Sequence, residues 1–215
     1  MNTILECRGL TKRYGSGPAA VENVNLSVPC GRKVGLVGPA GSGKSTLLKL
    51  FAGVITPDAG KIYIGGYEPG PQAKAIVSYL PSNIYIPARM QLEDVIKHQA
   101  VFFEDMDTEK ASLMLGDMGI DPCTEAGALN DYGRKKAAFA IALGRRVPLY
   151  LLDDPFENTD PSFAAYAAKA VCDLAADSSV IIAGNEQILA MGLIDDVIRM
   201  DRARAVSAGP AQREV

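Results

Sequence analysis

The sequence has no tryptophan, a single histidine and no long apolar run. A membrane-spanning helix needs about 20 consecutive apolar residues. The nearest candidate, AAFAIAL at 137–143, is followed almost at once by Arg145 and Arg146. The opening MNTILECRGL also lacks the basic segment and apolar run of a signal peptide. We therefore expect a protein that works at a membrane only by docking on another protein that spans it.

Paired cysteines and excess basic charge are also absent. Cys7, Cys30, Cys123 and Cys172 are far apart and form no CxxC pair, which is typical of reduced thiols in a cytosolic protein. The net charge is −3 and the pI about 5.3, so we expect no nucleic-acid partner. With 48% hydrophobic and 22% charged residues, the 215-residue chain has an ordinary globular composition that suits one large α/β domain.

Short apolar strands alternate with helices along most of the chain, a pattern that favours a parallel sheet. Alternating polarity predicts a strand over 21–28, and further strands are expected over 33–38, 61–64, 75–80, 148–153, 179–183 and 196–200. Helices are expected over 44–52, 91–103, 108–118 and 162–176, and from 130 onward. We interpret 88–128 as a helical insertion into a core of 1–87 and 129–215, with Asp107 as the N-cap of its second helix.

The clearest motif is GPAGSGKST at 38–46, which matches GxxxxGK[ST] completely and lies between a predicted strand and a predicted helix. Glycines let successive backbone N–H groups turn inward around phosphate oxygens, and the helix N-terminus adds partial positive charge. We expect Lys44 to reach the β- and γ-phosphates and the Ser45 hydroxyl to bind Mg²⁺. The predicted nucleotide contacts are Gly38, Pro39, Ala40, Gly41, Ser42, Gly43, Lys44, Ser45 and Thr46.

A second acidic motif, PLYLLDDP at 148–155, supplies a partner for this loop. An apolar strand that ends in Asp153 is typical of a Walker B segment, which places a Mg²⁺-binding carboxylate at the carboxyl edge of the sheet beside the P-loop. Asp154 follows directly and would face the γ-phosphate, where a base can orient the attacking water. The two motifs in this order indicate a nucleotide triphosphatase.

Further segments, in the correct order, resemble the nucleotide-binding subunit of ATP-binding cassette (ABC) transporters over nearly the whole chain. LTKRYG with Tyr14 resembles the segment of the adenine-stacking aromatic, TPDAGKIYIGG at 56–66 the segment after the P-loop helix, and IVSYLPSN at 76–83 the Q-loop. LNDYGRKKAAFAIAL at 129–143 resembles the signature and its helix, DDPFENTD at 153–160 the Walker B segment and the D-loop ending on Asp160, and VIIAGNE at 180–186 the H-loop. YLPSNIYIPARM and FFEDMD resemble bacterial drug-export and antibiotic-response ATPases.

This resemblance implies an α/β P-loop NTPase fold with a mostly parallel sheet, an N-terminal antiparallel β part and a helical subdomain. It implies ATP and Mg²⁺ as ligands, and ATP held between two cassettes, with the P-loop of one facing the signature of the other. The partners would be a membrane-spanning subunit gripped by the helical subdomain and a second cassette, identical or different. The expected function is ATP hydrolysis that powers an exporter from the cytoplasmic face of the membrane.

The sequence departs from the family pattern in the signature, where Leu129 is followed by Asn130, Asp131, Tyr132 and Gly133 instead of SGGQ. Asn130 can still cap a helix, as serine would. Tyr132 places a bulky ring where glycine lets the backbone approach the partner's γ-phosphate. The basic run that follows, 134–136, is expected to be a solvated helix face, with contact to a partner's phosphates as the alternative.

Three other positions depart as well. Ser82 stands where the Q-loop has the glutamine that reaches the metal, Asp154 where the catalytic residue is glutamate, and Asn185 where the switch residue is histidine. Asp154 is one methylene shorter than glutamate, and an error of about 1 Å in a catalytic group can cost about 100-fold in rate. Asn185 can donate a hydrogen bond to phosphate but cannot become a cation.

These departures leave two hypotheses open: an ATPase subunit slowed by its departures from the family pattern, and an ATP-binding regulatory half of a heterodimer whose partner carries the competent residues. A third class, soluble ABC proteins of DNA repair or translation, is disfavoured because the chain is too short for tandem cassettes and has no long coiled coil. An adjacent gene for a membrane protein would favour transport, whereas one for a complete second cassette would favour the regulatory half.

Overall fold

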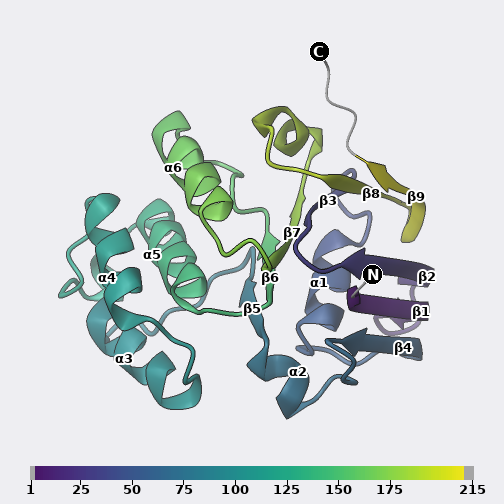
Figure 1. Ribbon diagram of the computed structural model, residues 1–215, viewed down its shortest axis with the longest axis horizontal. Helices are drawn as coiled ribbons and strands as arrows, with labels where there is room; N and C mark the ends of the chain where they lie inside the picture. The colour runs from purple at the N-terminus through teal and green to yellow at the C-terminus, as the bar shows by residue number, and fades with distance from the viewer. Residues whose placement is uncertain (1–2, 211–215) are drawn as a thin grey trace.

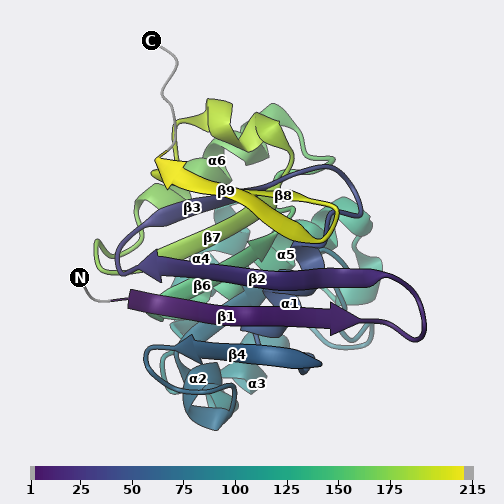
Figure 2. The same ribbon diagram turned by 90° about the vertical axis from the view of Figure 1, so that its right-hand side faces the viewer.

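The computed structural model describes residues 3–210, which fold around two β-sheets (Figure 1). The smaller sheet is antiparallel and has the strand order β2-β1-β4. Its strands are β1 (Thr3–Arg13), β2 (Ala19–Pro29) and β4 (Ala59–Ile64), and Figure 2 shows them side by side on one face of the molecule. Val21, Val24, Leu26 and Val28 are buried in β2 while the residues between them are more exposed, so the alternation seen in the sequence sets which face packs inward. The antiparallel N-terminal part is confirmed.

The larger sheet has six strands in the order β5-β6-β7-β3-β8-β9. They are β5 (Val77–Leu80), β6 (Leu149–Asp153), β7 (Ser179–Gly184), β3 (Lys33–Val37), β8 (Asp196–Asp201) and β9 (Arg204–Pro210). All neighbours are parallel except β8 and β9. Every residue of β6 and β7 is buried, as continuous apolar strands in a covered parallel sheet should be. The mostly parallel sheet expected from the sequence is therefore confirmed.

The helices match the predicted segments, with two differences. They are α1 (Lys44–Phe51), α2 (Pro71–Ala75), α3 (Leu92–Phe102), α4 (Thr108–Asp117), α5 (Asp131–Gly144) and α6 (Pro161–Cys172), with short 3₁₀ helices at Ala126–Ala128 and Glu186–Met191. The predicted end of α6 at 176 is wrong, because the helix stops at Cys172. The second difference is α2, which was not predicted because five residues are too few to show a helical period.

Two hydrophobic cores cover opposite faces of the larger sheet. One gathers around α1, between the two sheets, and includes Leu47, Leu48 and Phe51. The other lies between the sheet and α3 to α6, and includes Phe139 and Leu143. Figure 1 shows α3, α4 and α5 together on the side away from the smaller sheet. Within residues 3–210, no helix is both long and apolar enough to cross a bilayer.

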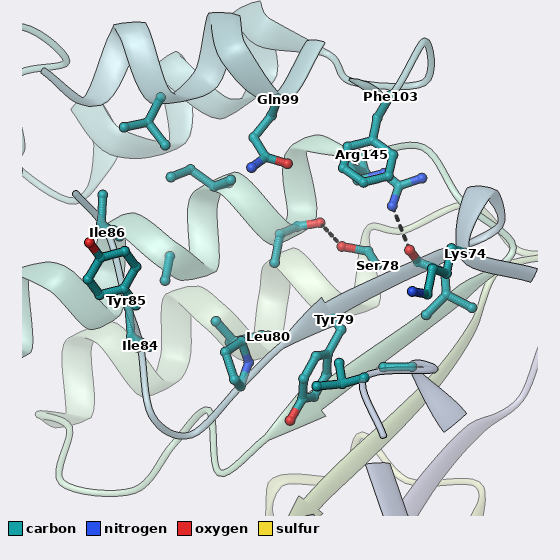
Figure 3. Close-up of a pocket in the computed structure, with 18 residues that line it drawn as sticks. Lys74, Ser78, Tyr79, Leu80, Ile84, Tyr85, Ile86, Gln99, Phe103 and Arg145 are labelled. Carbon is teal, nitrogen blue, oxygen red and sulfur yellow. Dashed lines mark hydrogen bonds between the residues drawn. The ribbon is translucent and has the colours of Figure 1, made fainter. Parts of the chain in front are cut away.

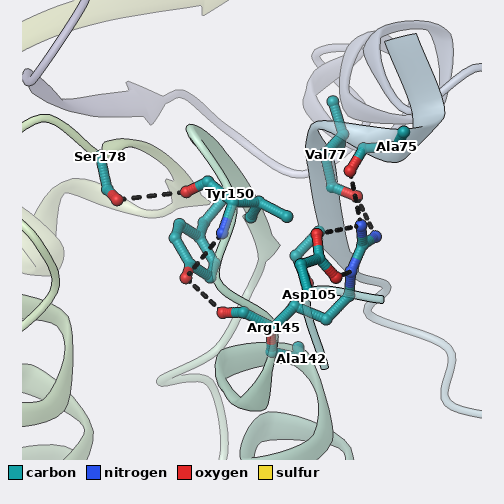
Figure 4. A network of polar contacts seen from close by, with 9 residues as sticks. Ala75, Val77, Asp105, Ala142, Arg145, Tyr150 and Ser178 are labelled. Atoms are coloured by element: carbon teal, nitrogen blue, oxygen red, sulfur yellow. Dashed lines mark hydrogen bonds and ion pairs between the residues drawn. The ribbon is translucent and has the colours of Figure 1, made fainter. Parts of the chain in front are cut away.

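A buried arginine joins the helical segment to the edge of the larger sheet (Figure 4). Nε and Nη2 of Arg145 each lie 2.8 Å from a carboxylate oxygen of Asp105, and the guanidinium also donates to the backbone carbonyls of Ala75 and Val77. Its carbon Cζ lies 3.8 Å from the ring centroid of Phe103. A buried charge needs such complete pairing, so this contact ties the loop after α3 firmly to the start of β5. The subdomain boundaries at 88 and 128 stay a prediction.

Candidate nucleotide-binding site

The P-loop connects β3 to α1 and packs closely against the backbone of β8 and β2. Gly38 and Gly43 both have positive φ, at 156° and 102°. A Cβ atom at Gly38 would lie 2.2 Å from the Met200 carbonyl oxygen, and one at Gly43 would lie 2.2 Å from that of Ala20. Only glycine fits such positions, so the spacing of the motif follows from the packing of the loop against β8 and β2.

Two P-loop side chains are held in place at the start of α1. Lys44 Nζ donates to the carbonyls of Gly38, at 2.8 Å, and Pro39, at 3.0 Å, and so folds over the loop. The Ser45 hydroxyl donates to Asp153 Oδ1 at 3.0 Å. Asp153 is the last residue of β6 and is buried, with 1% of its surface exposed. The structure thus brings together the serine and the carboxylate that the sequence predicts as magnesium ligands.

The donor set at Asp153 fits Mg²⁺. Its second oxygen, Oδ2, is buried and has no hydrogen-bond partner among residues 3–210. A buried unpaired carboxylate oxygen is costly, and a hard divalent cation beside it would satisfy it. Ser45 and Asp153 supply two oxygens and leave the remaining positions for phosphate oxygens and water. Ser82 is exposed beyond the end of β5, and in the described part of the chain the Ser45–Asp153 contact does not extend to it.

Tyr79 on β5 is a neighbour of this site that the sequence analysis missed. Its hydroxyl is buried without a hydrogen-bond partner in the described chain, and burial raises the pKa of the phenol, with the charges of Asp153 and Tyr14 raising it further. Tyr79 is therefore near both Asp153, the predicted magnesium ligand, and Tyr14, the predicted adenine-stacking residue. Tyr14 follows β1 and is 53% exposed, so its ring is open to a base. The available sequence signal was a tyrosine within the predicted strand 75–80.

Asp154 begins the loop between β6 and α6. Its φ of 50° is left-handed, and its N–H donates to the Ala183 carbonyl at 3.0 Å, which turns the chain sharply after the strand. Burial raises the pKa of the Asp154 carboxyl above its ordinary value, and the negative charges of Asp153 and Glu157 raise it further. Lys44 and Lys135 oppose that rise. Asp154 therefore lies within the field of the P-loop lysine, as its predicted role requires.

Lys135 corrects one expectation from the sequence, that the basic run at 134–136 is a solvated face. Its ammonium donates to the Glu157 carbonyl, and burial lowers its pKa, with Glu157 and Asp154 opposing that shift. This lysine faces the loop after β6 because it lies one helical turn into α5, on the side packed against that loop. The contact links segments 22 residues apart, which no local sequence pattern reveals.

Asn185 follows β7, at the same carboxyl edge of the sheet as the P-loop and Asp153. Its side-chain oxygen accepts a hydrogen bond of 2.9 Å from the Gln187 N–H and so caps the 3₁₀ helix Glu186–Met191. The side chain is exposed. Its position is compatible with the predicted role, although its oxygen already serves the backbone.

The signature residues are turned toward their own chain. Asn130 caps α5, since its Oδ1 accepts a hydrogen bond of 2.7 Å from the Gly133 N–H, so that expected cap is present. The Tyr132 hydroxyl donates to the carboxylate of Asp160, and its ring meets the edge of Phe163 at 5.9 Å. Asp160 also caps α6 by accepting from the Phe163 N–H at 2.8 Å. The signature and the D-loop are therefore joined within one chain.

A groove of about 390 Å³ lies on the helical side of β5 (Figure 3). Its lining comes from β5 and the segment after it, from α3 and from α5, and includes Leu80, Ile84, Tyr85, Gln99 and Phe103. Tyr85 is 87% exposed at this groove. The lining residues lie outside the P-loop, but they include Tyr79, so the groove adjoins the nucleotide site through β5.

Comparison with known proteins agrees with this geometry. The family described as "ABC transporter" matches residues 21–157. The Fe(3+) ions import ATP-binding protein FbpC of Pseudomonas fluorescens is 30% identical over 95% of this chain and 61% of its own length. The phosphonates import ATP-binding protein PhnC 1 of Rhodopseudomonas palustris is 26% identical over 97% of this chain and 85% of its own length. The chain thus spans about three fifths of the FbpC relative.

Solved structures share the fold. A structure of the ATP-binding subunit of an ABC transporter has a TM-score of 0.87 at 22% identity, and the match covers 97% of this chain and 90% of the chain in that structure. The dimeric post-hydrolysis state of the ATP-binding cassette MJ0796, bound to ADP and Pi, has a TM-score of 0.83 at 20% identity, and covers 98% of this chain and all of its own. The family match spans the P-loop and the Ser45–Asp153 pair described above. The chain therefore belongs to the ABC transporter family, as an ATP-binding domain.

Proposed function

We propose that this chain binds and hydrolyses Mg-ATP and thereby powers a separate membrane-spanning transporter subunit. The observation that carries the proposal is the contact between Ser45 and Asp153, with the unpaired Asp153 Oδ2 beside it. In this proposal Ser45 and Asp153 hold Mg²⁺, Lys44 neutralises phosphate charge, and Asp154 orients the attacking water. Bound Mg²⁺ would offset charge on the phosphates as the terminal bond breaks.

The remaining predicted residues serve the nucleotide in the same scheme. The P-loop residues at 38–46 surround the phosphates, Tyr14 stacks on adenine, and Asn185 donates to the γ-phosphate. Ser82, exposed beyond the end of β5, is the remaining predicted metal-binding residue in this scheme. Phosphate release under saturating Mg-ATP tests the proposal, and its absence in a chain assembled with its membrane partner would contradict it.

The groove beside β5 is the proposed docking site for a cytoplasmic helix of the membrane subunit. It has an apolar floor, and exposed Tyr85 lies at it. Attachment there would hold the protein at the cytoplasmic face of the membrane. Photocrosslinkers at Tyr85 and at exposed Lys61 on the opposite side should distinguish this: the first should capture the co-expressed membrane subunit, the second should not.

The direction of transport, import or export, is not part of the proposed function. Export was expected from the sequence, and the relatives do not support it, because FbpC and PhnC are named for import. Their named ions, Fe(3+) and phosphonates, are candidate classes of cargo for a transporter that contains this chain. Uptake measured in vesicles of defined orientation would assign the direction.

A catalytically impaired half of a heterodimer is the second candidate. Two observations favour it: Tyr132 is bonded to its own chain's Asp160, and the Asp131 side chain is 99% exposed at the start of α5. A partner's γ-phosphate would meet the Asp131 carboxylate there, which is paired with Arg134 of its own helix. Mixing this chain with a cassette that has complete motifs should then give more phosphate release than either chain alone.

A further inference from the structure

Two side chains on the first turns of α5 contact the loop between β6 and α6. Tyr132 and Lys135 are three residues apart, so they lie on the same face of the helix. The Tyr132 hydroxyl donates to the Asp160 carboxylate at the end of the loop, and the Lys135 ammonium donates to the Glu157 carbonyl in its middle. The loop is therefore held at two points by one helix.

The Tyr132 ring has its own support, independent of the hydroxyl. Its edge-on contact with Phe163 is 5.9 Å between centroids, and Phe163 in turn meets Phe139 at 5.5 Å. The ammonium of Lys136 lies 4.6 Å from the Tyr132 ring centroid. Removal of the hydroxyl alone should therefore leave the ring in place and break only the bond to Asp160.

The loop backbone turns through the left-handed region twice. Asp154 and Asn158 have φ values of 50° and 53°, in a region where Asp and Asn are the most frequent residues after glycine. At the β6 end, the Asp154 N–H is bonded to Ala183, and inside the loop the Thr159 hydroxyl donates to the Phe156 carbonyl at 2.8 Å. From α5, Tyr132 and Lys135 add the contacts to Asp160 and Glu157 described above.

We propose that Tyr132 and Lys135 are positioning residues that clamp the loop 154–160 to α5 within one chain and so aim the Asp154 carboxylate at the P-loop. The clamp is an intrachain use of the signature segment, and its chemical consequence rests on the proposed ATPase function. Lys135 also places positive charge near Asp154, where Lys44 is the other nearby cation and Asp153 and Glu157 are the neighbouring acids. When the Lys44 ammonium binds phosphate, Lys135 continues to balance these acids.

The test compares Tyr132→Phe and Lys135→Met with matched controls elsewhere in the chain. Tyr166→Phe removes a hydroxyl that donates to Asp117 at 3.1 Å, and Lys110→Met removes a half-buried lysine on α4. Amide hydrogen exchange over 156–160 is measured without nucleotide. The clamp variants should exchange about fivefold faster there, since a hydrogen bond to a charged group is lost, and the controls should match the parent.

Phosphate release supplies the second measurement. Tyr132→Phe and Lys135→Met should lower kcat about tenfold with little change in the KM for ATP, since a small displacement of Asp154 affects the reaction more than binding. Lys135→Arg, which can still donate to the Glu157 carbonyl, should restore most of kcat. Exchange equal to the parent's in both clamp variants, or faster exchange with unchanged kcat, would overturn the proposal. A parent without phosphate release would refute the proposed function instead, and hydrogen exchange alone would then confirm or overturn the clamp.

Discussion

The starts of α1 and α5 are built in opposite ways. At α1, the N-cap is Gly43, and within the described chain no side chain caps the helix and no acid lies in its first turn. At α5, Asn130 caps the helix and Asp131 adds a negative charge to the first turn. Free N–H groups at a helix start attract anions, whereas a capped start with its own carboxylate does not need one. The start of α1, where ATP is predicted to bind, is thus open, whereas the start of α5, which the resemblance predicts to face a partner's nucleotide, is capped by its own chain.

The strongest way to break this contrast is to remove the cation from the open helix start. Lys44→Ala should weaken ATP binding about 100-fold, because a charge-assisted contact to phosphate is lost. Lys49→Ala, in the last turn of the same helix, is the control and should bind ATP like the parent. Titration calorimetry measures both, and unchanged affinity in Lys44→Ala would refute the phosphate site.

Removal of the predicted adenine contact should have a smaller effect. Tyr14→Ala should weaken ATP binding about tenfold, on the scale of base–aromatic stacking. GTP should compete appreciably with ATP in the parent, because stacking discriminates little between bases. Tyr67→Ala is the matched control, since Tyr67 is also exposed, at 45%. Equal affinities in the two variants would mean that Tyr14 is structural.

A longer carboxylate at position 154 tests the catalytic part of the site. Asp154→Glu combined with Asn185→His should raise phosphate release about fivefold, if the nucleotide is held correctly and only the water-orienting geometry is short. Tyr132 is unchanged in this variant, because its hydroxyl is bonded to Asp160. No rise, with ATP binding intact, would favour the impaired half of a heterodimer.

The smallest effect is expected at the capped helix start. Asn130→Ala should lower the free energy of unfolding by about 1 kcal/mol, because the Gly133 N–H loses its acceptor. ATP affinity should remain that of the parent, since the Asn130 side chain bonds the Gly133 N–H and lies outside the P-loop. Urea denaturation and calorimetry measure the two quantities, and a large loss of ATP affinity would contradict the contrast between the helix starts.

Local patterns predicted the parts of the site that lie close together in the sequence. The P-loop glycines and the apolar strand before Asp153 are contiguous motifs, and their contact follows from the parallel order of β3, β7 and β6. The strand β9 was not predicted, because RAVSAGP has a single β-branched residue and ends in Gly-Pro. The contacts of Tyr132 and Lys135 were also missed, since they join segments 28 and 22 residues apart and depend on how α5 packs.

The bonding of Arg145 has a mechanical consequence for the groove. One planar guanidinium holds the Asp105 carboxylate and the carbonyls of Ala75 and Val77 at once. If the segment at Phe103 and Asp105 moves, the first residue of β5, Val77, should therefore move with it. Lysine would keep the charge but has no planar fork to hold these acceptors together. At this position the stiffness of the link, more than its stability, depends on arginine.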